Sequence, residues 1–410
     1  MRALESILYL FLVSIPLGTR VLIFDFAPAA GEYGRVFLYL SDILLILFLV
    51  VFYAKVGGIY WQKPYSLIIF LGSASLSVFW AASFGLAVYS LARLLLLVMA
   101  ALAVAKLLKI GAAKIEKILA ALAISAVLQS GLGVAQFVGQ SDLGLQRLGE
   151  AVIAPDISGV AKIVVGGEKI VRAYGTLPHP NILAAFLLLG LLALCYLWLR
   201  NEKSLRLYET IGIFAVLLGL TLTFSRTAWG IAVLGILAIA IWKKSWRLLI
   251  AVVLCGAAVF SVLQPQILSR LALSADEPAA ALRATYNKIG LEIAKNNLLG
   301  VGIGNQVEYS IKNLVYQKFG LDQPWQHQPT HNLYLLMAAE IGLLGFGAFL
   351  FFILNSGVWN LFRISTILLA ALLLFGLTDH FLWTSQTGQL ALWMVIGLVL
   401  GSKDGAGYLN

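Results

Sequence analysis

The chain has 410 residues, of which 61% are hydrophobic and only 12% are charged, against about 25% charged in an ordinary soluble domain. This balance excludes a protein built from two or three water-soluble domains, which the length alone would favour. A formal net charge of +10 does not indicate nucleic-acid binding, because the basic residues gather in short loops between long apolar runs. The composition predicts an all-α polytopic membrane protein, since nothing shows the alternating strands of a β-barrel.

About twelve apolar runs have roughly the length that a bilayer requires, and we predict a membrane helix in each. They cover residues 4–19, 36–54, 65–82, 84–105, 115–138, 180–199, 208–224, 227–242, 246–263, 332–354, 360–378 and 386–401. The first run could be taken for a signal peptide, but Arg20 and Asp25 separate it from the small-residue stretch 27–29. We therefore expect it to be retained, within a single membrane domain spanning residues 1–410.

The lysines and arginines of the short loops alternate with the spans. Basic groups follow the fourth and eighth runs, in the segments 106–117 and 243–247, whereas a short loop such as 81–83 after the third run carries none. Basic loops stay in the cytoplasm in membrane proteins. We therefore predict a protein of the inner (cytoplasmic) membrane with both termini in the cytoplasm.

Two long connections, residues 139–179 and 264–331, then fall on the extracytoplasmic face. Loops of this length in a compact bundle are usually functional. Apolar residues of the second connection recur at helical spacing, at Leu282, Tyr286, Ile289 and Ile293. This spacing predicts an amphipathic helix that lies on the membrane surface or over a cavity.

His331 stands where the second connection meets the next apolar run. Pro329 argues against a helix continuing from upstream, and Thr330 or Asn332 can cap the helix that follows. An imidazole, with an ordinary pKa of about 6.5, can take a proton near neutral pH, so His331 could deprotonate a sugar hydroxyl at a helix mouth. The alternative is a capping or interfacial histidine without chemistry.

The pattern His331-Asn332, nine residues, Gly342-x-x-Gly345 resembles the signature of the bacterial O-antigen ligases, within the O-antigen ligase and polymerase superfamily. Phe346 replaces the small polar residue that usually follows. The resemblance implies a helical membrane fold of the GT-C-like type. It also implies transfer of a glycan from an undecaprenyl-diphosphate carrier to an acceptor hydroxyl on the extracytoplasmic face, without cofactor, nucleotide sugar or metal.

Arg226 lies in a tight outer link between two apolar runs, Thr223-Phe-Ser-Arg226-Thr-Ala-Trp229. A planar guanidinium suits phosphate because it donates two parallel hydrogen bonds, but a snorkelling interfacial arginine is the alternative. The Ser-Arg-Thr-small pattern is similar to one in the superfamily. The resemblance implies that Arg226 holds the donor diphosphate, beside His331 as general base on the acceptor.

Further candidates for substrate contact precede and follow this link. A second superfamily element resembles the segment Arg172-x-x-Gly175-Thr176 and the His179-Pro180-Asn181 that follows it. We expect Arg172 to contact phosphate or glycan, and His179 to be mainly structural. Prolines on both sides of His179 favour a turn.

The segment 296–305, with its spaced glycines, resembles a third superfamily element and is expected to shape a loop above the active cavity. Arg283 occupies the position of an arginine common upstream of that element, so it is a second anion-binding candidate. Asn332 completes the substrate-binding set beside the catalytic pair.

Arg93 falls inside the fourth apolar run, where an arginine marks a functional site by default. It could equally pair with Asp379 or with a helix carbonyl. Asp379 and His380 could form a hydrogen-bonded pair near the cavity, or a helix end that faces water.

A metal site is not predicted. His327 and His331 are four residues apart, but Pro329 lies between them and no nearby carboxylate completes a ligand set. The expected partners are therefore the lipid-linked glycan donor, a lipid or glycolipid acceptor and the membrane itself, with no nucleic acid.

Three other functions stay open. A Wzy-type polymerase of lipid-linked repeat units and a protein oligosaccharyltransferase have similar motifs. A membrane transporter is the alternative from a different class, although transporters tend to show repeated halves and polar breaks near the bilayer midplane, which this sequence lacks.

Overall fold

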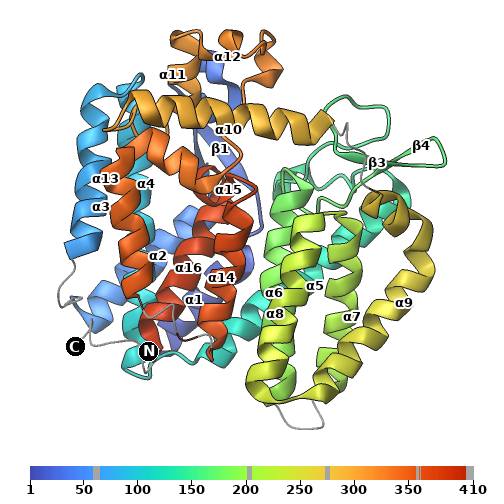
Figure 1. Cartoon of the computed structure of the whole chain (residues 1–410). Helices are drawn as coiled ribbons and strands as arrows, with labels where there is room; N and C mark the ends of the chain where they lie inside the picture. Colours follow the sequence, from blue (N-terminus) through green and yellow to red (C-terminus); the bar gives the residue numbers. More distant parts are fainter. Residues whose placement is uncertain (59–64, 201–205, 273–277, 357–359, 361, 403–410) are drawn as a thin grey trace.

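The computed structural model describes residues 1–410 except 59–64, 201–205, 273–277, 357–359, 361 and 403–410. Helices dominate the described chain, with two small hairpins at one end (Figure 1). The α-helices are α1 (Arg2–Ser14), α2 (Leu40–Val56), α3 (Tyr65–Ser77), α4 (Phe84–Lys109), α5 (Ile115–Gly139), α6 (Pro180–Arg200), α7 (Arg206–Leu222), α8 (Arg226–Lys243), α9 (Trp246–Leu271), α10 (Pro278–Asn296), α11 (Gln306–Lys312), α12 (Val315–Lys318), α13 (Leu333–Asn355), α14 (Ile364–Gly376), α15 (Phe381–Thr384) and α16 (Gln386–Gly401).

Short 3-10 helices and strands complete the secondary structure. The 3-10 helices are η1 (Pro28–Gly34), η2 (Val78–Trp80), η3 (Gln146–Leu148) and η4 (Pro324–Gln326). The strands form two antiparallel pairs, β1 (Arg20–Asp25) with β2 (Arg35–Tyr39) and β3 (Lys162–Val165) with β4 (Glu168–Val171).

Each predicted apolar run coincides with a helix for most of its length, and the all-α membrane class is confirmed. Among the described residues, six helices are long and apolar enough to cross a bilayer: α4, α5, α6, α8, α9 and α13. Shorter apolar helices cover 65–80, 364–376 and 386–401. The count of about twelve spans and the GT-C-like arrangement stay predictions.

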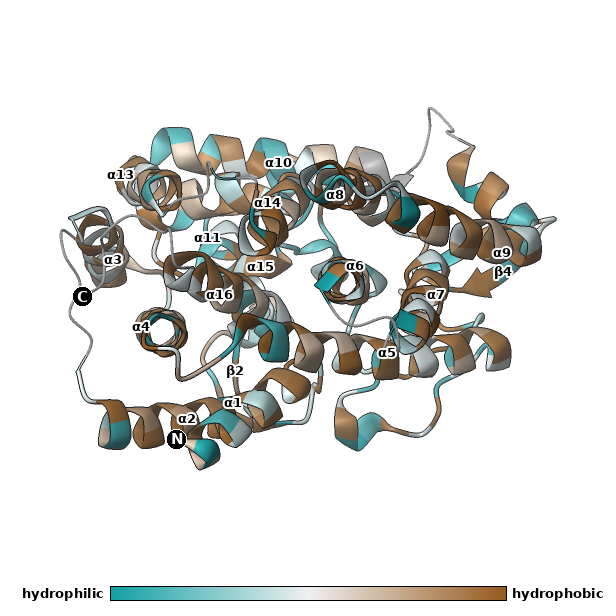
Figure 2. Cartoon of the chain, turned by 90° about the horizontal axis from the view of Figure 1, so that it is seen from below, coloured by the Kyte–Doolittle hydropathy of each residue, from teal (hydrophilic) through white to brown (hydrophobic). Residues whose placement is uncertain are grey.

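Helix α6 forms the centre of the bundle. Its sequence is apolar all round and nearly every residue is buried, as expected for a helix that is packed on all sides (Figure 2). Gly190 permits close contact with α5, because a Cβ there would lie 2.2 Å from the Cβ of Ala126. On the outside of the bundle, α9 exposes large apolar side chains such as Val253, Leu254 and Val262. Such a surface fits lipid rather than water.

Helix α10 lies across one end of the bundle, and the N-terminus lies at the opposite end (Figure 1). Tyr286, Ile289 and Ile293 of α10 are buried in a second, smaller apolar core with Tyr316 of α12 and Ala339 of α13. This core attaches the α10–α12 layer to the helix that follows His331.

Some predicted boundaries are wrong. Residues 36–39 belong to β2 rather than to a helix, and α2 begins at Leu40, where the Asp42 carboxylate accepts a hydrogen bond from the Tyr39 amide (3.1 Å). This capping contact fixes the start of the helix. The β1–β2 hairpin before it was not predicted.

Helix α9 also extends past its predicted end. It continues to Leu271 with Pro265 inside it, and the helical geometry is interrupted at Leu263. A proline inside a helix removes one backbone hydrogen bond but does not always end the helix. The first part of the second long connection is therefore helical.

Candidate active site

A cavity of about 820 Å³ has a wall formed by residues from both halves of the chain, among them Arg283 of α10 and Val307 of α11. This volume falls within the usual range for ligand sites. Predicted site residues in the wall are His179, Arg283, His331 and Arg93. Arg226, Arg172 and Asn332 are not part of the wall, so the structure brings together four of the seven.

His331 lies in the wall just before α13, and its ring is held on two sides. It stacks on Tyr286 of α10, with ring centroids 4.9 Å apart, and meets His380 edge to face at 4.8 Å. Its Nδ1 lies 2.9 Å from the carbonyl oxygen of Pro329. A carbonyl only accepts, so Nδ1 carries the proton and the lone pair is on Nε2. Within the described part of the chain, Nε2 has no hydrogen-bond partner.

The protonation state of His331 follows from its surroundings. Burial lowers the pKa of His331, Asp379 raises it, and the positive charge of Arg283 lowers it again; the net pKa lies below the ordinary value. The imidazole is therefore neutral near pH 7. A neutral imidazole with an unoccupied Nε2 is the form in which a histidine can accept a proton.

Asp379 and two further histidines complete this part of the wall. The Asp379 carboxylate accepts hydrogen bonds from Asn181 Nδ2 (3.0 Å) and from the His380 amide (2.8 Å). Burial raises the pKa of Asp379, but His380 and the other two histidines outweigh it and lower the pKa to about 2. Burial lowers the pKa values of His179 and His380 to about 3 each. The group therefore holds one carboxylate among neutral imidazoles.

Arg283 projects from α10 into the same wall. Among the residues that the structure describes, it has no ion-pair or hydrogen-bond partner. Its charge lowers the pKa values of His179, His331 and His380, whose rings line the same cavity. An arginine without a carboxylate partner at a cavity wall can bind an anion.

Arg172 lies behind the wall and supports it. Its Nε donates to the carbonyl oxygen of Thr223 (2.6 Å), and its Nη2 donates to Asn181 Oδ1 (3.0 Å). Asn181 in turn donates to Asp379. Arg172 therefore orients the amide that holds the Asp379 carboxylate, and it joins this carboxylate to the turn before α8.

Arg226 is the first residue of α8 and is half-buried. It is not in the cavity wall, although the neighbouring Thr227 Oγ1 lies 3.5 Å from Thr378 Oγ1, one residue before Asp379. Asn332 caps α13: its Oδ1 accepts from the amides of Tyr334 and Leu335 (3.0 Å each). That contact fixes the helix start directly after His331.

The spaced glycines of the 296–305 segment contact α13 through the backbone. The Val301 amide donates to the carbonyl of Ala339 (2.9 Å), and the Leu343 amide donates to the carbonyl of Leu298 (3.0 Å). Helix α13 is broken at this point, because Gly342 has φ +76° and ψ 170°. A Cβ on Gly342 would lie 2.6 Å from the Leu298 carbonyl oxygen, which explains the glycine.

Glu340 joins three elements of the site and was not singled out from the sequence. Its carboxylate is 3% exposed and accepts from the amides of Gly304 (2.7 Å) and Gln306 (3.2 Å) and from Trp383 Nε1 (2.7 Å). The sequence did contain a signal for this role, because a single carboxylate inside an apolar run needs buried hydrogen-bond donors.

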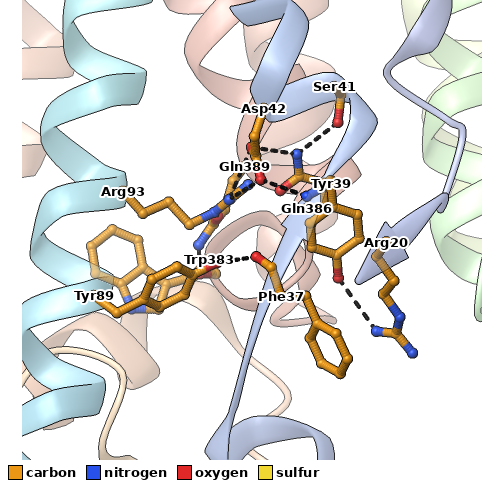
Figure 3. Close-up of polar contacts among 10 residues, drawn as sticks. All are labelled: Arg20, Phe37, Tyr39, Ser41, Asp42, Tyr89, Arg93, Trp383, Gln386 and Gln389. Carbon is orange, nitrogen blue, oxygen red and sulfur yellow. Dashed lines mark hydrogen bonds and ion pairs between the residues drawn. The ribbon is translucent and has the colours of Figure 1, made fainter. Parts of the chain in front are cut away.

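Arg93 pairs with Asp42 rather than with Asp379 or a helix carbonyl. Its Nη1 lies 3.2 Å from Asp42 Oδ1, and its Nε donates to Gln389 Oε1 (Figure 3). The expected alternatives for its partner are therefore wrong. Arg93 nevertheless lines the cavity, in a part of the wall to which β2, α4 and α16 contribute.

The histidines and Asp379 of the cavity wall are not arranged as a metal site. Within the described ranges, no set of three His, Cys, Asp or Glu side chains could hold a metal ion. His327 stacks on Tyr316 with centroids 4.6 Å apart, whereas His331 stacks on Tyr286, so the two histidines belong to different aromatic pairs.

Comparison with known proteins gives one result. Residues 211–350 match the family model described as O-antigen ligase. This range contains Arg226, Arg283, the glycine segment, His331 and Gly345, and it leaves Arg93 and Asp379 outside. No curated protein matches the chain. Over residues 211–350 the chain matches the pattern of the O-antigen ligase family, which confirms for this part of the chain the predicted resemblance to the O-antigen ligase and polymerase superfamily.

Proposed function

We propose that this membrane protein is a glycosyltransferase that moves a glycan from an undecaprenyl-diphosphate carrier to a hydroxyl of a lipid or glycolipid acceptor. The family match supports an enzyme of this general type. The observation that carries the proposal is His331, which presents an unoccupied Nε2 in a cavity wall shared with Arg283.

The reaction follows from these two groups. The acceptor oxygen attacks the anomeric carbon of the glycan, its proton passes to His331 Nε2, and the carbon–oxygen bond to the diphosphate breaks with its electron pair left on the diphosphate. A positioned general base contributes about 10²–10⁴-fold. Asp379 would stabilise the imidazolium that forms, because its charge raises the pKa of His331.

The leaving diphosphate needs positive charge. Arg283 is proposed to contact it directly, because it lines the cavity and has no carboxylate partner in the described chain. Arg226 is proposed as a second ligand, for a diphosphate that extends beyond the cavity towards α8. The first amides of α8 and its helix dipole would favour an anion at the same place. Arginines matched to the leaving group can replace a metal.

The active site is proposed to face the extracytoplasmic side of the inner membrane. Arg283 of α10 lines the cavity, and α10 lies at the end of the bundle opposite the N-terminus (Figure 1). The basic short loops predict that the N-terminal side is cytoplasmic. A lipid-linked donor would then reach the cavity from the outer leaflet.

The test is a reconstituted transfer assay with an undecaprenyl-diphosphate-linked glycan and an added lipid acceptor, comparing the wild type with His331→Ala. We expect one glycan shift onto the added lipid, lost in the variant. A ladder that forms on the carrier without acceptor would establish a polymerase, and glycan on an added acceptor protein an oligosaccharyltransferase. Equal product from a folded His331→Ala variant would exclude the base role. No product in any lane would favour transport.

A further inference from the structure

A second group of polar side chains lies at the cavity wall, apart from the histidines: Arg93, Gln386 and Gln389 line the wall, and Asp42 is bonded to two of them without lining it. We call Asp42, Arg93, Gln386 and Gln389 the Arg93 cluster (Figure 3). Gln386 Nε2 donates to Asp42 Oδ1 (2.8 Å) and to Ser41 Oγ (2.7 Å). Three helices, α2, α4 and α16, therefore meet through hydrogen bonds at this cluster.

The cluster is buried, yet two of its polar atoms are unpaired. The side chain of Arg93 is 9% exposed and that of Asp42 is 7% exposed. Among the described residues, Arg93 Nη2 and Gln386 Oε1 have no hydrogen-bond partner. A buried polar group without a partner is unfavourable, because it has lost its hydrogen bonds to water without replacing them. Both residues line the cavity, so a ligand there could supply the missing acceptor and donor.

The charge of the cluster selects the kind of ligand. The guanidinium of Arg93 is balanced by the Asp42 carboxylate 3.2 Å away, and the two amides are neutral. An anion would gain little here, in contrast to the wall near Arg283. The unpaired atoms are one donor and one acceptor, which is the combination that a hydroxyl group satisfies, since it both donates and accepts.

Aromatic rings line the same part of the wall. Tyr89 donates from its hydroxyl to the carbonyl of Phe37 (3.1 Å), and Trp383 is held by Glu340, so both rings have fixed positions. Tyr39 and Phe37 of β2 also line the cavity. Aromatic faces beside a few placed polar groups form a site that suits a ligand with apolar faces and hydroxyl edges.

We propose that the Arg93 cluster and the rings around it form a subsite for a neutral sugar ring. Vicinal hydroxyls of the ring would accept from Arg93 Nη2 and donate to Gln386 Oε1, while its C–H face packs on an aromatic ring. That this sugar belongs to a substrate of the transferase rests on the proposed function; the binding itself does not.

The binding test uses the purified full chain in lipid nanodiscs and saturation-transfer NMR. The probes are the methyl glycosides of N-acetylglucosamine, galactose and rhamnose, with inorganic pyrophosphate as the anionic probe. Arg93→Lys is the test variant, because lysine can keep the ion pair with Asp42 but lacks Nη2. Arg35→Lys is the matched control: Arg35 lies in the same wall and pairs with Asp25 (2.9 Å), outside the cluster.

We expect at least one glycoside to bind the wild type, and Arg93→Lys to weaken that binding about tenfold, as expected for a lost charge-assisted hydrogen bond. Arg35→Lys should bind as the wild type does, and pyrophosphate should not displace the glycoside. Gln386→Met, which removes the unpaired acceptor, should weaken binding as well. Thermal unfolding would show that each variant is folded.

Other results would overturn the subsite. These are no glycoside bound by the wild type, equal weakening in Arg93→Lys and Arg35→Lys, or displacement by pyrophosphate. The transfer assay separates this outcome from the proposed function. If glycoside binding depends on Arg93 but no glycan is transferred, only the proposed transferase function is contradicted. If Arg93→Lys transfers glycan with an unchanged KM, only the proposed subsite is contradicted.

Discussion

Trp383 donates a 2.7 Å hydrogen bond from its indole Nε1 to Oε2 of Glu340, so α15 and α13 meet through a buried carboxylate. The same carboxylate accepts from the Gly304 and Gln306 amides, and all its partners are donors. Glu340 therefore positions the glycine segment, the helix that follows His331 and an aromatic residue of the cavity wall.

Glu340→Gln is expected to destabilise the protein by about 1–3 kcal/mol, because an amide has one oxygen and would direct its own NH₂ at a donor. The measurement is the thermal unfolding midpoint in detergent. Glu292→Gln on α10 is the control, since that side chain is partly exposed. An unfolding midpoint of Glu340→Gln equal to that of the control would contradict the role of the carboxylate.

Activity should depend on pH through His331. The base acts in its neutral form, so the rate falls as the pH drops through its pKa, and that pKa is lowered by burial. The acid limb of kcat/KM should therefore lie below pH 6.5, the ordinary value for histidine. An acid limb at or above that value would contradict the inferred environment.

Asp379→Asn should shift the acid limb of the pH–rate profile to still lower pH. The carboxylate raises the pKa of His331, so its removal lowers the pKa and shifts the acid limb to lower pH. The imidazole becomes a weaker base, and the maximal rate should fall. The measurement is a pH–rate profile of both proteins. A shift of the limb to higher pH would show that Asp379 does not act on His331.

Arg283→Gln should give the opposite shift. Arg283 lowers the pKa of His331, so its loss raises the pKa and moves the acid limb to higher pH. If Arg283 also binds the leaving diphosphate, kcat should fall roughly 10²–10³-fold, as when a preorganised transition-state donor is removed. Lys288→Gln, an exposed change on the same helix, is the control. Comparable losses in both variants would point to general charge rather than to Arg283.

Gly342→Ala should destabilise the protein, whereas Gly347→Ala in the same helix should not. Gly342 has φ +76° and its Cβ would lie 2.6 Å from a carbonyl oxygen, whereas a Cβ at Gly347 meets nothing within 4 Å. The backbone conformation at φ +76° and ψ 170° is essentially restricted to glycine and costs roughly 1–3 kcal/mol with a side chain. Unfolding midpoints of the two variants provide the comparison. Equal midpoints would show that α13 can straighten.

Hydropathy located the helices because lipid imposes length and composition on them. It could not locate the β1–β2 hairpin, whose first strand is exposed throughout and carries no burial pattern. Two ion pairs accompany the hairpin instead, Arg20 with Glu32 (2.6 Å) and Arg35 with Asp25 (2.9 Å). Such contacts follow from pairing of the strands and leave no periodic signal in the sequence.

Motifs located His331 and Arg283, which the fold places in one wall. They did not predict that Arg93 pairs with Asp42, because the two residues are brought together only by the packing of α2 against α4. For Arg172 the motif identified the residue but not its contacts. The resemblance marked it as a contact for phosphate or glycan, and only the structure places it behind Asn181, with its guanidinium engaged by Thr223 and Asn181.

The break at Gly342 divides α13 into a short segment that carries the site and a longer one that enters the bilayer. The glycine segment holds both sides of the break: the Val301 amide donates to Ala339 of the short segment, and the Leu343 amide of the longer segment donates to Leu298. The start of the longer segment is therefore held by the same residues as the short one, so bending of α13 in a thicker or thinner membrane is expected beyond Leu343. His331 would then keep its distance from Arg283 while the lipid around the protein changes, which would protect the proposed chemistry from changes in the bilayer.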